Sequence, residues 1–193
     1  MNALDRAKEY LDQALKAGKQ VILALEGPAA SGKTTLAAAL SESYGAPIIH
    51  MDEFFLPPAL RTADRFAQPG GNIHYERFWD QVAIPLRAGI PFAYETFDCG
   101  RMAMGGEKQV SSSSLILVEG VYSLHPLYRD VYTHRIFLCC DEKVQDVRLR
   151  LRGEWLYDRF QREWLPMERV YFSVCRPREC CDLVLDTGSS LEE

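Results

Sequence analysis

The chain has 193 residues and a formal net charge of −5, with 47% hydrophobic and 25% charged residues. This length favours one domain, residues 1–193, around a single well-buried core. The acidic balance argues against nucleic acid as a partner, because binding to a phosphate backbone requires a basic face. No apolar stretch approaches the roughly 20 residues that a membrane span needs, so we expect no membrane partner.

The amino-terminal segment, residues 2–17, has the pattern of an amphipathic helix. Leu4, Leu11 and Leu15 share one helical face, with acidic residues early and Lys16 late, as the helix dipole prefers. Acidic residues are not typical of a transit peptide, so we expect a cytoplasmic protein. The six cysteines show no CxxC spacing and are expected to be free thiols in that compartment.

Short continuous apolar runs predict the strands of a parallel sheet that helices cover on both faces. These runs occupy residues 21–25, 48–49 with their neighbours, 115–118, 135–139 and 183–185. The helical patterns occupy residues 33–43, 75–88, 141–152 and 158–174. The predicted fold class is therefore three-layer α/β.

Two segments depart from this simple alternation. In residues 158–174 an aromatic stripe repeats at helical spacing and is interpreted as core packing, while Pro166 should kink or divide the helix. Residues 91–96 predict a further strand, and Gly105-Gly106 predicts a turn after it.

Residues 27–34 read GPAASGKT, a complete match to GxxxxGK[ST] between a predicted strand and a predicted helix. This context predicts a phosphate-binding loop instead of a Gly-rich turn without a ligand, because its N–H groups and the following helix favour an anion. Lys33 is expected to reach the β- and γ-phosphates, and the Thr34 hydroxyl to ligate Mg²⁺. The residues expected at the nucleotide here are Gly27, Ala29, Ala30, Ser31, Gly32, Lys33, Thr34 and Thr35.

Acidic residues follow two of the other predicted strands, at the sheet edge where ligands collect in open α/β sheets. Asp52 is our candidate for the base that accepts a hydroxyl proton, and for a further Mg²⁺ ligand. Its alternatives are a helix-capping role and the neighbouring Glu53 as the base. Glu119 is the candidate Mg²⁺ ligand at the end of a Walker B-like strand, with a solvated strand-end carboxylate as its alternative.

Residues 143–162 hold six basic and three acidic residues within an acidic chain. Arg148 and Arg152 are four apart, so we expect them to share a helix face and to close together over a triphosphate, with Gly153 as the hinge of a lid spanning about residues 148–165. The alternative is a solvated basic face.

From Val21 to Thr187 the sequence resembles the uridine kinase family of P-loop nucleoside kinases, and is also similar to phosphoribulokinase and bacterial pantothenate kinase. The segments that carry the resemblance are GPAASGKTT, HMDEFF, GGNIHYERF, YETFDCGR, LILVEGVYSL, RLRLRG and CDLVLD. The resemblance implies a five-stranded parallel sheet of order 2-3-1-4-5, with ATP and Mg²⁺ as co-substrates. It also implies Asp52 as the base, lid arginines at Arg148 and Arg152, and adenine near Asp186 and Thr187.

The sequence departs from the family pattern at three positions near the acceptor. His74 stands where the family carries a ribose-binding aspartate, Cys99-Gly100 where it carries a histidine, and Gln145 where an arginine opens the lid helix. The residues that we expect to line the acceptor pocket are His74, Tyr75, Arg77, Tyr94, Phe97, Asp98 and Arg101. His74 has a surface position as its alternative.

The sequence therefore predicts an ATP- and Mg²⁺-dependent kinase that phosphorylates a hydroxyl group of a small molecule, with a nucleoside favoured. Pantothenate or a sugar phosphate is the alternative acceptor. A nucleotide-binding regulator without an acceptor is the alternative function, and the missing NKxD segment disfavours a GTPase. The oligomeric state is left open by the sequence.

Overall fold

The computed structural model describes residues 1–188, which are built around a parallel five-stranded sheet. Its strands are β1 (Val21–Glu26), β2 (Ile48–His50), β5 (Leu115–Glu119), β6 (His134–Cys139) and β7 (Leu183–Asp186). They lie in the order β2-β5-β1-β6-β7. Counted along the chain within this sheet alone, that order reads 2-3-1-4-5. The labels differ from those of the sequence prediction because β3 and β4 form a separate hairpin.

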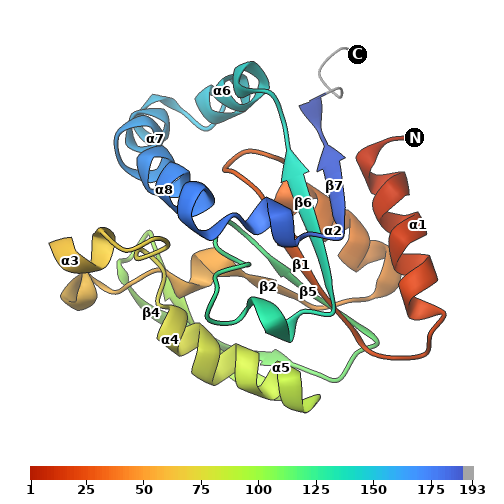
Figure 1. Ribbon diagram of the computed structural model, residues 1–193. Coiled ribbons are helices and arrows are strands. Elements are labelled where there is room, and N and C mark those ends of the chain that lie inside the picture. The colour runs from red at the N-terminus through yellow and green to blue at the C-terminus, as the bar shows by residue number, and fades with distance from the viewer. Residues whose placement is uncertain (189–193) are drawn as a thin grey trace.

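Helices cover both faces of the sheet and make three layers (Figure 1). On one face, α1 (Ala3–Leu15) and α2 (Lys33–Tyr44) bury Leu11 and Leu40 against β1 and β5. On the other face lie α4 (Tyr75–Phe78), the π-helical turn η3 (Trp79–Ala83), α5 (Ile84–Ala88) and α8 (Leu165–Cys175). The remaining helical segments are η1 (Met51–Phe54), η2 (Pro58–Leu60), α3 (Ala63–Phe66), η4 (Arg129–Val131), α6 (Glu142–Arg150), α7 (Glu154–Arg159), η5 (Phe160–Trp164) and η6 (Pro177–Cys180).

The parallel register brings three strand ends to one edge. Leu25 of β1 and His50 of β2 both lie opposite Glu119 of β5. Above this edge, α6 follows β6 directly, and α7 and α8 lead from α6 back toward the middle of the sheet (Figure 1). The acidic residues at these strand ends are therefore neighbours of the phosphate loop.

The hairpin differs from its prediction. β3 (Phe92–Asp98) pairs antiparallel with β4 (Ala103–Val110), so Gly105 and Gly106 lie inside a strand and the predicted turn there is wrong. The turn comes earlier because Asp98 accepts hydrogen bonds from the N–H groups of Gly100 and Arg101, at 2.8 and 3.1 Å. Gly105 serves close strand approach, because a Cβ there would overlap the Thr96 hydroxyl.

The predicted helices at 141–152 and 158–174 are both divided differently. α6 ends at Arg150, so Arg148 and Arg152 do not share a helix face as predicted. The second pattern covers the end of α7, the π-helical turn η5 and most of α8, with Pro166 in the first turn of α8. The helix type changes from π to α just before Pro166, while the chain stays helical from Glu154 to Cys175.

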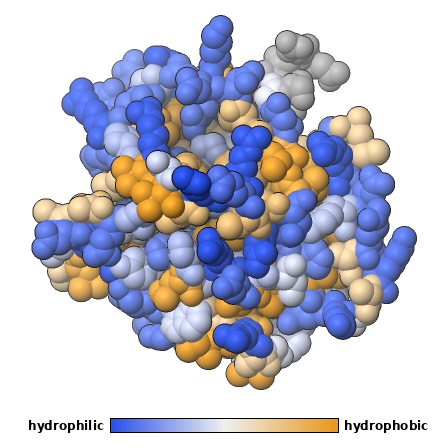
Figure 2. Space-filling view, viewed as in Figure 1, coloured by the Kyte–Doolittle hydropathy of each residue, from blue (hydrophilic) through white to orange (hydrophobic). Residues whose placement is uncertain are grey.

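The surface of the described part is mainly polar. Hydrophobic residues on the face in view form separate patches within a hydrophilic surface (Figure 2). Among residues 1–188, no helix combines the length and the apolar character that crossing a membrane requires.

The end of β1 is the most constrained point of the fold. The fully buried Glu26 carboxylate accepts hydrogen bonds from the N–H groups of Gly27 and Leu124, at 2.9 and 3.0 Å, and from the Tyr171 hydroxyl at 2.9 Å. Burial raises its pKa to about 7, although these donors favour the charged form. Gly27 follows with φ +148°, and its backbone lies against the Leu138 carbonyl.

We expect Gly27→Ala to lower the free energy of unfolding by at least about 2 kcal/mol, because the added Cβ overlaps the Leu138 carbonyl and the backbone φ disfavours a side chain. Gly106→Ala is the matched control, since no atom lies within 4 Å of a Cβ there. Urea denaturation of both variants measures the difference. Equal stability of the two would contradict this account of the loop.

Glu26 also predicts a pH dependence of stability. A folded pKa raised from 4.5 to about 7 stabilises the protein below pH 4.5, and this contribution is lost as the pH rises through 7. Between pH 4.5 and 7, the free energy of unfolding of the wild type should therefore fall by up to about 3 kcal/mol relative to that of Glu26→Gln. Denaturation at several pH values measures it, with Glu42→Gln on the exposed surface of α2 as the control. A difference that does not change with pH would refute the raised pKa.

Candidate active site

The phosphate loop joins β1 to α2 and is held by its carbonyl groups. Gln145 donates to the Ala29 oxygen at 2.8 Å, Arg148 to the Ala30 oxygen at 3.2 Å, and the Thr187 hydroxyl to the Ser31 oxygen at 2.9 Å. Because the N–H and C=O of a peptide point in opposite directions, the amides of Ala30 and Gly32 point away from these donors, while the Ser31 N–H binds the Pro28 carbonyl at 3.2 Å. The free N–H groups at the start of α2 extend the same anion-binding surface.

Lys33 and Thr34 lie at the mouth of this loop. The Lys33 ammonium donates to the Pro28 carbonyl at 2.8 Å, and the residue is only 7% exposed. The Thr34 hydroxyl donates to Glu119 at 3.2 Å. A cavity of about 610 Å³, the donor cavity, is bordered by both residues. Its other borders within the predicted site are Ala30, Gly32, Thr35, Arg148, Arg152 and Thr187.

A second cavity of about 330 Å³, the inner cavity, lies on the other side of Lys33 and Thr34. Asp52, Glu119 and Arg152 border it, so it collects the predicted base, the predicted metal ligand and one predicted lid arginine. Lys33, Thr34, Ala30 and Arg152 border both cavities. Of the predicted catalytic groups, Lys33 and Arg152 therefore border both cavities, whereas Asp52 borders only the inner cavity and Arg148 only the donor cavity.

Asp52 faces the inner cavity from the first turn of η1, and its neighbour faces elsewhere. Glu53 accepts a hydrogen bond from Tyr94 at 2.7 Å and pairs with Lys108. Asp52 is exposed, but it lies at a cavity walled by protein. Partial removal from water at this position and the negative charge of Glu119 both raise the pKa of its carboxyl group. His50, and not Asp52, is the N-cap of η1, so the helix-capping alternative does not apply.

Glu119 is fixed from two sides. His50 Nδ1 lies 2.6 Å from Glu119 Oε1, and the Thr34 hydroxyl binds the same oxygen. The hydrogen bond between His50 and Glu119 raises the pKa of His50. Among the described residues no group of three or more His, Cys, Asp or Glu forms a ready metal site. The Thr34, Glu119 and Asp52 oxygens nevertheless suit Mg²⁺, a hard cation that takes few protein ligands besides phosphate oxygens.

The two predicted lid arginines have different surroundings. Arg148 donates to the Thr187 carbonyl at 2.7 Å and to its hydroxyl at 3.0 Å, besides the Ala30 carbonyl. It is thus bound to backbone beside the donor cavity and does not border the inner cavity. Arg152, beyond the end of α6, borders both cavities and lies 5.4 Å above the Phe160 ring. Asp186, predicted at adenine, is exposed and accepts from Gly188 N–H at 2.7 Å.

The residues predicted for the acceptor pocket do not border the inner cavity. Tyr94 and Phe97 are buried in the core, and Arg77 donates to the backbone carbonyls of Glu95 and Glu53. His74 caps α4 by accepting from Arg77 N–H at 3.2 Å, and burial lowers its pKa. The others are Tyr75, which stacks on His125, Asp98, which holds the hairpin turn, and exposed Arg101. For Tyr94 and Phe97 the reason is the packing of β3, which buries both side chains.

Other residues take their place at the cavity. Glu168 is buried and accepts from Ala29 N–H at 2.9 Å, and burial raises its pKa. Asn72, Phe55 and Trp164 also border the inner cavity. The sequence signal for Glu168 was a single acid in the apolar helix LPMERVYF, whereas Trp164 was hidden in the stripe interpreted as core. Of the stripe residues Phe160, Trp164, Met167 and Tyr171, the interpretation holds for Tyr171, which is buried in the core. Phe160 and Trp164 border the inner cavity, and Met167 borders another cavity.

No protein-family model matches the sequence, and no curated protein matches it. Several solved structures, in contrast, have a similar fold. A possible uridine kinase from Bacillus stearothermophilus is 20% identical over 94% of this chain and 100% of its own, with a TM-score of 0.68. A protein described as a candidate fructose transport system kinase from Silicibacter sp. TM1040 is 23% identical over 86% of this chain and 89% of its own, with a TM-score of 0.64.

A shikimate kinase from Acinetobacter baumannii, solved with shikimate, is 16% identical over 91% of this chain and 87% of its own, with a TM-score of 0.51. All three are kinases by their descriptions, and their similarity extends over most of the chain. These comparisons establish that the chain has the fold of P-loop kinases, an α/β fold with a parallel five-stranded sheet flanked by helices.

Proposed function

We propose that the protein is a kinase that transfers the γ-phosphoryl group of ATP to a hydroxyl group of a small molecule, with Mg²⁺ bound to the nucleotide. One observation carries the proposal: the donor and inner cavities meet at Lys33, Thr34 and Arg152, with Asp52 on the far side. A phosphoryl transfer needs two substrate sites that meet in line, because its transition state is formed mainly by positioning and charge. The fold shared with known kinases supports this assignment.

In the proposed mechanism, the loop amides and the start of α2 bind the β- and γ-phosphates, and Lys33 turns from the Pro28 carbonyl to them. The acceptor oxygen bonds to the γ-phosphorus while the bond to the β-phosphate oxygen breaks, which leaves ADP. Asp52, which borders the inner cavity, accepts the hydroxyl proton. Thr34 and Glu119, with Asp52, would hold Mg²⁺, which neutralises phosphate charge when bound.

We propose a lid at about residues 148–165. Gly153 separates α6 from α7 with φ +99°, and a Cβ there would meet no atom within 4 Å, so this joint has room to move. Closure of α7 and η5 would exclude water, which otherwise competes as the acceptor, while Arg152, just before this joint, already borders both cavities. Arg148 is proposed to hold the adenine side of the donor cavity together with Thr187.

The sequence resemblance favours a nucleoside as acceptor in a cytoplasmic enzyme, with pantothenate or a sugar phosphate as the alternative. The decisive experiment incubates the protein with ATP and Mg²⁺ against nucleosides, pantothenate and phosphosugars, and measures ADP. ADP release that depends on one acceptor class supports the kinase. Release that is flat across the panel supports the alternative, a nucleotide-binding regulator without an acceptor.

Asp52→Asn should reduce kcat by about 10²–10⁴-fold, because the amide cannot accept the hydroxyl proton, with little change in ATP affinity. Glu53→Gln is the control, since that side chain binds Tyr94 and Lys108 outside the cavity. Steady-state ADP release and ATP binding by calorimetry provide the two measurements. Normal turnover in Asp52→Asn would remove Asp52 from the role of base.

Arg152→Ala should reduce kcat by about 10²-fold or more, because the guanidinium borders both cavities and would stabilise charge on the transferring group. Arg162→Ala serves as the matched control from the same lid segment, since Arg162 is 80% exposed and its nearest acid, Asp158, is 3.8 Å away. The same ADP assay compares them. Equal losses in both variants would indicate a general effect of lid charge.

A further inference from the structure

A third cavity, also about 330 Å³, adjoins the inner cavity and is called the outer cavity here. The two share a border formed by Phe55, Asn72, Cys99, Leu156 and Trp164. A single elongated molecule can therefore reach from Asp52 into the outer cavity. Since small-molecule sites combine an apolar lining with a few placed polar groups, the lining of the outer cavity describes the part of the acceptor remote from the reacting hydroxyl.

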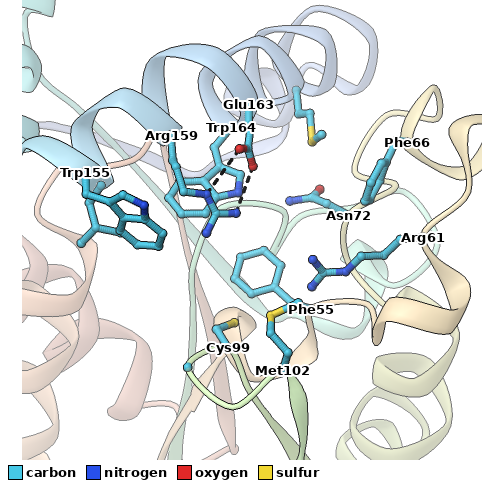
Figure 3. A pocket seen from close by; sticks show the side chains of 13 residues that line it. Phe55, Arg61, Phe66, Asn72, Cys99, Met102, Trp155, Arg159, Glu163 and Trp164 are labelled. Carbon is cyan, nitrogen blue, oxygen red and sulfur yellow. Dashed lines mark hydrogen bonds and ion pairs between the residues drawn. The ribbon is translucent and has the colours of Figure 1, made fainter.

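The walls of the outer cavity are mainly apolar and aromatic. Phe55, Phe66 and Trp164 surround its centre, and Met102 lies beside Phe55 (Figure 3). Aromatic faces and sulfur atoms bind apolar or planar groups by burial and by stacking. The body of the acceptor should therefore be apolar or planar, and not densely hydroxylated.

Asn72 supplies a polar group at the border with the inner cavity. The residue is 8% exposed, and its Oδ1 atom is buried without a hydrogen-bond partner in the described part of the chain. A buried carbonyl oxygen without a donor costs free energy, which a ligand donor removes. The acceptor should therefore present an N–H or O–H group at this point.

Arg61 supplies charge at the far side. Its Nε donates to the Leu56 carbonyl at 2.8 Å, and its guanidinium points into the cavity toward Phe55 (Figure 3). No carboxylate of residues 1–188 forms an ion pair with it, whereas the other arginine of this cavity, Arg159, pairs with Glu163 at 3.0 Å. The guanidinium thus retains donors suited to a planar anion, which it can bind bidentately.

We propose that the acceptor is an amphipathic anionic alcohol: a hydroxyl at Asp52, an apolar or planar body with a donor against Asn72, and a carboxylate or phosphate bound by Arg61. This inference rests on the proposed kinase function and narrows its acceptor, because a neutral nucleoside would leave Arg61 without a counter-charge. The phosphoryl group moves from ATP to the hydroxyl oxygen, the proton moves to Asp52, and the remote anion does not react.

The test compares matched alcohols. Pantothenate against panthenol isolates a carboxylate. Uridine 3′-phosphate against uridine isolates a phosphate on a molecule with a planar base and a free 5′-hydroxyl, and uridine also represents a neutral nucleoside. We expect one anionic member to exceed its neutral partner by at least about tenfold in kcat/KM, the size of one charge-assisted hydrogen bond. Arg61→Gln should raise KM for that member about tenfold with kcat nearly retained, and Arg61→Lys should restore part of it.

Arg87→Gln, at an exposed position of α5, is the control and should leave both constants unchanged. Equal turnover of charged and neutral partners, or preference for uridine in both wild type and Arg61→Gln, overturns the acceptor assignment and leaves the kinase standing. Binding is followed separately by the fluorescence of Trp155 and Trp164, which border the outer cavity. Arg61-dependent binding of the anionic member without ADP release supports this site and overturns the kinase, whereas neither binding nor turnover overturns both.

Discussion

The phosphate loop and the walls of the inner cavity depend on one buried carboxylate, that of Glu26. It accepts hydrogen bonds from Gly27 in the loop, from Leu124 in the segment after β5, and from Tyr171 of α8. These segments are far apart in sequence, and each is continuous with residues that border the inner cavity. A charged group without water is stable only when donors surround it, so the position of each segment is coupled to the other two.

A second set of contacts holds the loop from its outer side. Gln145 and Arg148 of α6 and Thr187 after β7 bind the loop carbonyl groups, while Glu168 of α8 binds one loop amide. The phosphate loop is thus fixed by side chains from both ends of the segment proposed as a lid. Since α6 and α8 hold the loop while Gly153 separates α6 from α7, motion of this segment is expected to be concentrated in α7 and η5.

The sequence predicts the donor half of the site better than the acceptor half, for a physical reason. The phosphate loop, Asp52 and Glu119 each follow a buried strand, and the parallel sheet alone brings such strand ends together. The acceptor side is built from irregular segments whose packing is not encoded locally. In the β3–β4 hairpin the strand register shifts between Glu95 and Phe97, and the side chains of Tyr94 and Phe97, on either side of the shift, are both buried. Similarly, Phe160 and Trp164, at the two ends of the π-helical turn η5, both border the inner cavity, so the stripe interpreted at α-helical spacing is not wholly core.

The three cavities also fix where chemistry can occur. Lys33, Thr34 and Arg152 separate the donor cavity from the inner cavity, and Asn72 and Trp164 separate the inner cavity from the outer one. In the proposed kinase, a phosphoryl group held by the first set would meet a hydroxyl presented within the inner cavity, beside Asp52. The remote body of an acceptor in the outer cavity would supply binding energy and hold that hydroxyl in place. The specificity of the proposed kinase would therefore reside in the irregular segments α3, the hairpin turn and η5, while the sheet supplies the donor machinery.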